Sequence, residues 1–276
     1  MAEKMFLTPI ETAKALVGVG EKKAQLPILK MLVLGILAGV YIGFAAHLAT
    51  TISTGDYAFG IKKFLTGAVF ACGLMLVIIP GSELWTGNNL MSVALLENKI
   101  NIAQLLKNWF FVYLGNFLGS LLLALIIANS GLASNAEVGL TACSIAAGKC
   151  SLPFLSALCR GIGCNWLVCL AVVMALAAQD IGGKVWGIFF PIMAFVASGY
   201  EHSIANMYFI SAGIFNKMDV INVLVAAGKP IPPSFEALNW YNFLITNLVP
   251  VTLGNFIGGS LFVGGIYWYT FVKEDK

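Results

Sequence analysis

Charged residues are scarce in this chain. Asp, Glu, Lys and Arg make up 11% of its 276 residues, against roughly 25% in an average soluble domain. Hydrophobic residues account for 59%, and the mean hydropathy is +0.88. This composition argues against a soluble fold and predicts a membrane protein. The formal net charge is only +3, which gives no sign of nucleic-acid binding.

The motifs of common enzymes and metal sites are also missing. The sequence has no His-Glu-x-x-His motif and no carboxylate pair that supports catalysis, and its six cysteines lack metal-ligand spacing. We therefore expect no enzyme activity, no catalytic residue, no metal and no cofactor. A membrane-embedded enzyme that uses His202 with Glu201 or Glu83 is the disfavoured alternative.

Long apolar runs dominate what is present. A helix needs about 20 apolar residues to cross a bilayer, and the chain offers six such segments. They lie near 31–52, 64–95, 109–129, 153–177, 185–215 and 242–271. The sequence predicts an all-α membrane protein with six transmembrane helices.

The segment before the first run predicts an interfacial helix. Thr8-Pro9-Ile10-Glu11 is a capping box with proline at the first helical position, so we expect a helix over about 9–23. Its apolar residues fall on one face, as in helices that lie along a membrane surface. No cleavable signal peptide is evident in Met1 to Lys30.

The basic residues predict the orientation. Six crossings put both termini on one side, and with the termini in the cytoplasm the inner segments carry most of the lysines. Those lysines are Lys4, Lys14, Lys22, Lys23, Lys30, Lys99, Lys107, Lys184, Lys273 and Lys276. The outer segments hold Lys62, Lys63, Lys149, Lys217 and Lys229.

Two polar, glycine-bearing segments interrupt the second and fifth apolar runs. They lie at Pro80–Asn89 and Ser198–Met207, and both read Gly-x-Glu-x-x-x-x-Asn. Non-helical backbone at membrane depth is tolerated only where it lines a cavity enclosed by protein. Matched interruptions in two halves of a chain mark a binding or permeation site near the bilayer midplane. The sequence therefore predicts a pore or a carrier.

A second pair of similar segments extends this repeat. Leu114–Gly119 reads Leu-Gly-Asn-Phe-Leu-Gly, and Leu253–Gly258 reads Leu-Gly-Asn-Phe-Ile-Gly. Each half then holds three crossings, an odd number, so the halves enter the membrane from opposite sides and the repeat is inverted. We expect one transmembrane domain, with an N-terminal interfacial helix over 1–27, a first repeat over 28–129 and a second over 150–272.

Four motifs in this order resemble those of the formate/nitrite transporter family, which includes formate, nitrite and hydrosulfide channels. They are Glu83–Asn88, Arg160–Trp166, Glu201–Met207 and Gly254–Gly259, and the resemblance covers essentially the whole chain. It implies an aquaporin-like fold with broken second and fifth helices, and a homopentamer with one pore per protomer in a bacterial or archaeal inner membrane. It also implies transport of a small monovalent anion of a weak acid, often coupled to protons.

One position departs from the pattern. Trp85 stands where formate channels commonly have phenylalanine, so formate, hydrosulfide and nitrite all stay open as the permeant anion. An aquaporin-like pore for small neutral solutes is the alternative within transport. It is disfavoured because no Asn-Pro-Ala motif occurs.

His202 and Thr86 are the central candidates for the pore. An ionisable residue at mid-membrane depth is a functional hypothesis by default, although a neutral histidine bonded to a carbonyl is the plain alternative. The resemblance implies that His202 stands at the pore centre and shares a proton with the anion. Thr86 lies in the opposing break, where its hydroxyl is able to contact His202 or to cap the following helix.

Three further polar residues are assigned to the pore by the resemblance. Lys149, in the outer loop, is an ordinary solvated lysine on the sequence alone, and the resemblance implies that it reaches the pore and raises its potential. Asn165 and Asn255 lie in apolar crossings, where a buried amide must find partners. The resemblance implies that both line the central chamber. Cys143 and Cys150 lie in the same outer loop and are candidates for a disulfide.

Glu83 and Glu201 are acids inside the breaks. We expect them to accept hydrogen bonds from nearby backbone N–H groups and to hold the broken segments in shape. The alternative is that Glu201 gates the inner mouth, with Arg160 as its counter-ion.

Apolar constrictions are expected on both sides of the chamber, because they strip water from a charged solute. Motif position predicts Leu74, Leu84 and Val168 on the inner side and Phe70, Trp85 and Phe195 on the outer side.

Overall fold

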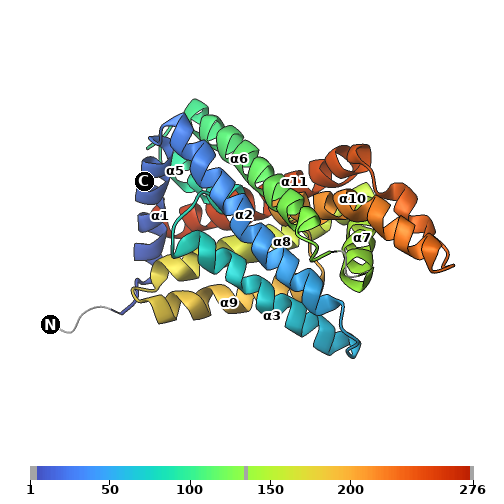
Figure 1. Cartoon of the computed structure of the whole chain (residues 1–276). Coiled ribbons are helices and arrows are strands. Elements are labelled where there is room, and N and C mark those ends of the chain that lie inside the picture. The colour runs from blue at the N-terminus through green and yellow to red at the C-terminus, as the bar shows by residue number, and fades with distance from the viewer. Residues whose placement is uncertain (1–4, 134–135, 274–276) are drawn as a thin grey trace.

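The computed structural model describes residues 5–133 and 136–273, which are helical nearly throughout (Figure 1). Lys4 and Lys276 of the charge count lie outside these residues. Within these two stretches, seven helices are long and apolar enough to cross a membrane. They are α2 (Ile28–Ser53), α3 (Phe59–Ile78), α6 (Ile102–Asn129), α8 (Phe154–Ala177), α9 (Ile181–Ser198), α10 (Ser203–Ala226) and the continuous C-terminal helix Asn242–Val272.

The predicted number of six crossings is therefore not confirmed. The run predicted over 64–95 consists of α3 and three short helices, α4 (Trp85–Asn88), η1 (Asn89–Met91) and α5 (Ser92–Leu96). The run predicted over 185–215 divides into α9 and α10, which have 18 and 24 residues and each meet the length criterion. The count differs because the second break leaves a full-length helix on each side of it.

Both breaks arise from residues that cannot continue a helix. After α3, Pro80 lacks a backbone N–H, and Gly81 has a φ of +96°. After α9, Gly199 has a φ of +80° and caps the helix in the left-handed region. The chain then runs extended to Leu84 and His202, the N-cap residues of α4 and α10. The two interruptions seen in the sequence are thus real breaks in helical geometry.

The expected N-terminal helix is present as α1 (Pro9–Ala24). Thr8 and Glu11 form the reciprocal capping box, with the Thr8 N–H donating to Glu11 at 2.8 Å. The buried face of α1 includes Ala13, Leu16 and Val17, which pack in a cluster with Leu90, Met91 and Val93 beside the first break. This helix lies across the end of the bundle (Figure 1).

Glycines allow close helix contacts in both halves of the chain. The helix α2 packs on α6, and α8 packs on α11 (Val249–Phe256). A Cβ atom on Gly119 would collide with the carbonyl oxygen of Ile36, and one on Gly258 would collide with that of Ile162. The small-residue pattern of the sequence therefore does hold these helix pairs in close contact.

One predicted loop is a helix. The segment that contains Cys143, Lys149 and Cys150 forms α7 (Ala136–Cys150), which packs against α10. Cys143 and Cys150 lie about two turns apart on it, or roughly 10 Å along the axis. A disulfide needs Cα atoms within about 7 Å, and both thiols are free. The proposed disulfide is therefore wrong.

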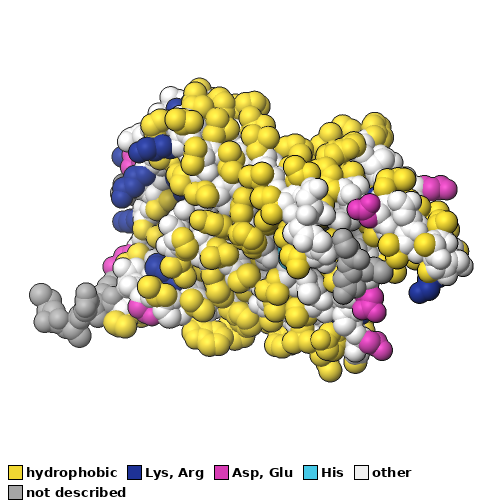
Figure 2. Space-filling view, in the orientation of Figure 1, with side chains coloured by type: hydrophobic (Ala, Val, Ile, Leu, Met, Phe, Trp, Pro, Cys, Tyr) yellow, Lys and Arg dark blue, Asp and Glu magenta, His cyan; other side chains and the backbone are white. Residues whose placement is uncertain are grey.

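The surface agrees with a membrane location. Apolar side chains cover the middle of the molecule in Figure 2, and most of the lysines visible there gather at the end where α1 lies. Acidic side chains are visible at the opposite end of the molecule in the same view (Figure 2). The protein is thus an integral membrane protein that crosses the bilayer several times.

Candidate pore and its two polar networks

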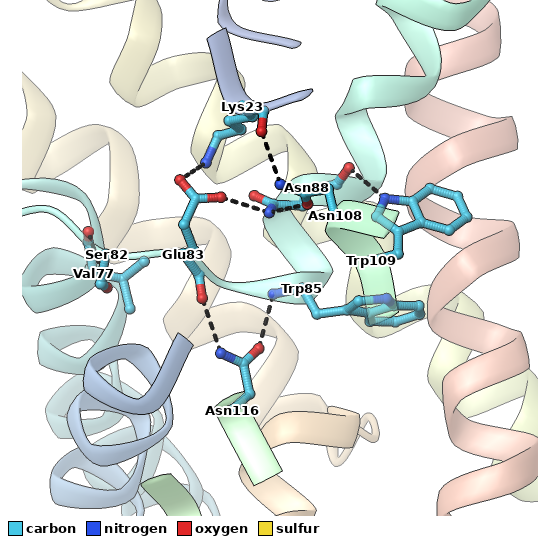
Figure 3. A network of polar contacts seen from close by, with 9 residues as sticks. All are labelled: Lys23, Val77, Ser82, Glu83, Trp85, Asn88, Asn108, Trp109 and Asn116. Carbon is cyan, nitrogen blue, oxygen red and sulfur yellow. Dashed lines mark hydrogen bonds and ion pairs between the residues drawn. The ribbon is translucent and has the colours of Figure 1, made fainter. Parts of the chain in front are cut away.

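The first break is held by a buried polar network (Figure 3). One oxygen of Glu83 pairs with the Lys23 ammonium at 2.6 Å, and the other accepts from the Asn88 amide at 2.7 Å. The same amide donates to Asn108 at 2.8 Å, and the Asn108 amide donates to the backbone oxygen of Lys23. Asn116 then clamps the extended backbone, because it accepts from Trp85 N–H and donates to Glu83 and Gly35 carbonyls.

The second break is held in the same way. Both oxygens of Glu201 lie 3.0 Å from the Lys149 ammonium, and the second also accepts from the Asn206 amide at 2.7 Å. Asn206 donates to Asn247 at 2.8 Å, and Asn247 donates to the backbone oxygen of Lys149 at 2.9 Å. Asn255 accepts from Ser203 N–H and donates to the Glu201 and Gly161 carbonyls.

The two networks match residue for residue. Lys23, Glu83, Asn88, Asn108 and Asn116 correspond to Lys149, Glu201, Asn206, Asn247 and Asn255, and each bond of the first set has its counterpart in the second. The correspondence includes the ends of α1 and α7, so these two helices occupy equivalent positions. Both acids accept hydrogen bonds at the breaks, but the donors are lysine ammonium and asparagine amide groups and not the backbone N–H groups that the sequence analysis expected.

His202 and Thr86 meet where the two breaks approach each other. Thr86 is fully buried and His202 is 2% exposed, and the Thr86 hydroxyl lies 2.9 Å from His202 Nε2. His202 Nδ1 accepts a hydrogen bond from the Ala205 N–H at 3.0 Å, so His202 caps α10. A backbone N–H only donates, so Nδ1 carries no proton and the neutral ring has its proton on Nε2.

This assignment sets the role of the threonine. Nε2–H donates to the Thr86 oxygen, which leaves the Thr86 hydroxyl proton free to be donated elsewhere. A second proton on the ring would have to sit on Nδ1, and that would break the bond to Ala205. The centre therefore presents one hydroxyl donor, oriented by the imidazole.

Two vestibules lie on either side of this contact. The α7-side vestibule has a volume of about 690 Å³ and reaches His202, with Phe70 and Phe195 beside it. The rings of Phe70 and Phe195 meet edge to face at 5.7 Å, and Phe195 stacks on His202 at 5.9 Å. The α1-side vestibule has a volume of about 330 Å³ and is lined by Leu74 and Leu84. Four of the six predicted constriction residues thus line the two vestibules.

The other two lie elsewhere. Val168 is buried in the core of the bundle. Trp85 packs edge to face on Trp109 and Tyr113, and it lines a separate lateral groove between α6 and the C-terminal helix.

The two predicted amides are occupied by backbone groups. Asn255 uses both amide hydrogens and its oxygen on the second break. Asn165 lies beside Thr86, and its amide nitrogen is within 3.2 Å of the Thr86 and Asn255 carbonyls. The buried oxygen of Asn165 has no partner among the described residues. Asn165 therefore adjoins the central contact, whereas Asn255 is committed to the break.

Lys149 reaches the α7-side vestibule from a helix, with its charge compensated. It pairs with Glu201, for which the gating alternative named Arg160 as the counter-ion. Arg160 is exposed and contributes only its backbone oxygen, which accepts from Glu201 N–H at 3.2 Å. In the part of the chain that the structure describes, no three metal-ligating side chains gather in one place.

Sequence reasoning missed Lys23, Asn108 and Asn247 as members of these networks. The sequence did carry one signal for Lys23. Gly35 and Gly161 are equivalent, since they accept from Asn116 and Asn255, and Lys23 precedes Gly35 by as many residues as Lys149 precedes Gly161. Asn88 and Asn206 end the repeated Gly-x-Glu-x-x-x-x-Asn motif, where their role had not been assigned.

Comparison with known proteins decides the family. The model of the formate/nitrite transporter family matches residues 10–269. This chain belongs to the formate/nitrite transporter family. A probable formate transporter of Methanothermobacter thermautotrophicus is 42% identical, and the match covers 98% of each chain. The formate channel FocA of Escherichia coli K12 is 38% identical, over 98% of this chain and 96% of its own.

Solved structures of this family share the fold. A pentameric formate channel with formate bound is 37% identical, with a TM-score of 0.78 over 89% of this chain and 98% of its own. An FNT family ion channel is 29% identical, with a TM-score of 0.81 over 94% of this chain and 98% of its own. These relatives are named as transporters and channels, in keeping with a protein that is not an enzyme.

Proposed function

We propose that this formate/nitrite transporter family protein forms a homopentameric channel for a small monovalent anion. Formate is the first candidate, because three of the four relatives described above are named for it, and hydrosulfide and nitrite are the others. The observation that carries the proposal is the contact between Thr86 and His202, which joins the two breaks between two vestibules. The pentameric relative with bound formate supports both the assembly and the cargo.

The arrangement proposed for the membrane is an aquaporin-like inverted repeat in which α9 and α10 together act as one broken crossing. The matching networks at the two breaks support it. Both termini would then lie in the cytoplasm, because the lysines at the α1 end (Figure 2) follow the positive-inside rule. The host membrane would be the inner membrane of a bacterium or archaeon.

The mechanism follows from the Thr86 hydroxyl. An anion that moves from a vestibule to the centre loses bound water at the apolar side chains. The Thr86 hydroxyl then donates a hydrogen bond to the anion and replaces one of those that water had supplied. Proton transfer from His202 needs a second proton on Nδ1 and the loss of the Ala205 bond. Hydrogen bonding to Thr86 is therefore the basic step, and proton coupling is an additional and more costly mode.

A pair of variants at Thr86 tests this function. We expect purified Thr86→Ser to keep formate currents in planar bilayers within about threefold of the parent, because serine retains the hydroxyl. Valine in Thr86→Val has the shape of threonine but no hydroxyl to donate. Loss of the hydrogen bond to the anion costs about 1.5–3 kcal/mol, which should lower the current by more than tenfold. Equal currents in the two variants would contradict the role of the hydroxyl.

The same bilayer recordings distinguish an anion channel from the alternative, a pore for small neutral solutes. A pore for small neutral solutes carries no anion current, so its reversal potential would not follow a formate gradient. A reversal potential that shifts with the formate gradient supports the anion channel.

A further inference from the structure

The α7-side vestibule brings together basic side chains from three helices. Lys62 and Lys63 reach it from the N-terminal part of α3, Lys149 from the end of α7 and Arg160 from α8. Glu201 is the one carboxylate among its lining residues. The vestibule therefore carries an excess of positive charge beside the pore centre.

Most of this charge is uncompensated. Glu201 is fully engaged by Lys149 and the Asn206 amide. Lys62, Lys63 and Arg160 have no ion-pair partner among the residues that the structure describes. The Lys63 ammonium lies over the Phe59 ring, 5.7 Å from its centre. Three cationic groups thus face one cavity with no anion to balance them.

The opposite vestibule differs. Lys23 is paired with Glu83 at 2.6 Å, and the Lys184 ammonium donates to the Ala175 and Ala178 carbonyls at the end of α8. Both ammonium groups of the α1-side vestibule are therefore held by oxygen atoms of the protein. The polar networks of the two halves match, so the larger number of cations without an anionic partner, three against Lys184 alone among the described residues, is one feature that distinguishes the two entrances.

Size and valence indicate the ligand. The cavity of about 690 Å³ is many times larger than a formate ion, and Coulomb attraction to the three cations doubles when the ligand charge doubles. A divalent oxyanion keeps its water strongly, so the apolar side chains of Phe70 and Phe195 beside His202 would stop it. We propose that the α7-side vestibule is a binding site for small divalent oxyanions of the sulfate type, which occupy it and block anion passage.

The test uses the channel in planar bilayers and rests on the proposed function for its readout. Formate current is recorded first, and then sulfate is added to one chamber and afterwards to the other, with chloride at the same ionic strength as the control. We expect sulfate to block each channel from one side only, and chloride to leave the current unchanged. Block from both sides, or equal block by chloride, would overturn the proposal.

Variants locate the site. Arg160→Gln and Lys63→Gln should each raise the sulfate concentration for half block by about three- to tenfold, the change expected when one charge several ångströms from a divalent ion is lost. Lys229→Gln is the matched control, because Lys229 is an exposed lysine at the same end that does not line this vestibule. Unchanged block in both vestibule variants would contradict the assignment.

Calorimetric titration of sulfate into the purified protein supplies a readout without transport. Saturable binding that weakens in Arg160→Gln and is unchanged in Lys229→Gln supports the site, even if no formate current is found and the proposed function fails. Normal formate current with no sulfate binding overturns the site and leaves the proposed function intact. Binding that is present without any block overturns the plugging role.

Discussion

The Lys149–Glu201 pair offers the sharpest test of the polar networks. Replacement of Lys149 by methionine removes the ammonium that lies 3.0 Å from both Glu201 oxygens. The carboxylate is then left with the Asn206 amide as its remaining partner, in a side chain that is 6% exposed. Loss of one partner of such a pair costs about 3–5 kcal/mol, because the other charge stays buried.

The lower end of that range applies here. The Lys149 side chain is 16% exposed and adjoins the vestibule, so water will replace part of the lost contact. We therefore expect Lys149→Met to destabilise the protein by about 3 kcal/mol. At about 2–4 °C per kcal/mol for a chain of this size, the melting temperature should fall by about 6–12 °C.

The double variant isolates the pair. In Lys149→Met with Glu201→Gln no charge is buried, and we expect about half of the loss in melting temperature to be recovered. Thermal unfolding of the purified protein in detergent, followed by tryptophan fluorescence, measures all variants. Lys229→Met is the control, because Lys229 is exposed. A double variant less stable than Lys149→Met alone would refute the reasoning.

Three further outcomes are expected. Lys23→Met should lower the melting temperature by a similar amount, because Lys23 is the counterpart of Lys149; an unchanged value would show that the networks are not equivalent. Gly119→Ala should reduce the yield of folded protein, since its Cβ collides with α2 backbone, whereas Gly148→Ala meets open space; equal yields from these two variants would contradict the close helix contact. His202→Asn retains an acceptor for the Ala205 N–H, so it should assemble normally, but without the imidazole the formate flux should lose its pH dependence. A retained pH dependence would show that the imidazole has no part in proton coupling.

Much of the fold was predictable from local patterns. Proline and glycine at Pro80, Gly81 and Gly199 fix the breaks through backbone geometry alone, and the capping box at Thr8 fixes the start of α1. These signals depend on neighbours within a few residues, which a sequence displays directly. The repeat was visible for the same reason, because its motifs are short and contiguous.

The polar networks were harder to predict because their members are far apart in the chain. Lys23 and Glu83 are separated by 60 residues and Lys149 and Glu201 by 52, so an unequal length of intervening chain hides their equivalence. The helix α7 was missed for a different reason. It has only 15 residues, too few to cross a bilayer, and its glycine, serine and threonine resemble a loop until the packing against α10 is known.

The duplicated framework gives a simple reason why the centre is not symmetric. Leu84 and His202 follow the two equivalent acids directly, and both are N-cap residues, but only the histidine caps with its side chain. A solute travelling from the α7 side meets an aromatic nitrogen ring at this point, and one travelling the other way meets a plain hydrocarbon chain. Two halves built alike thus present unlike side chains to solutes that approach the centre from opposite sides, because the residue after the acid is leucine in one half and histidine in the other.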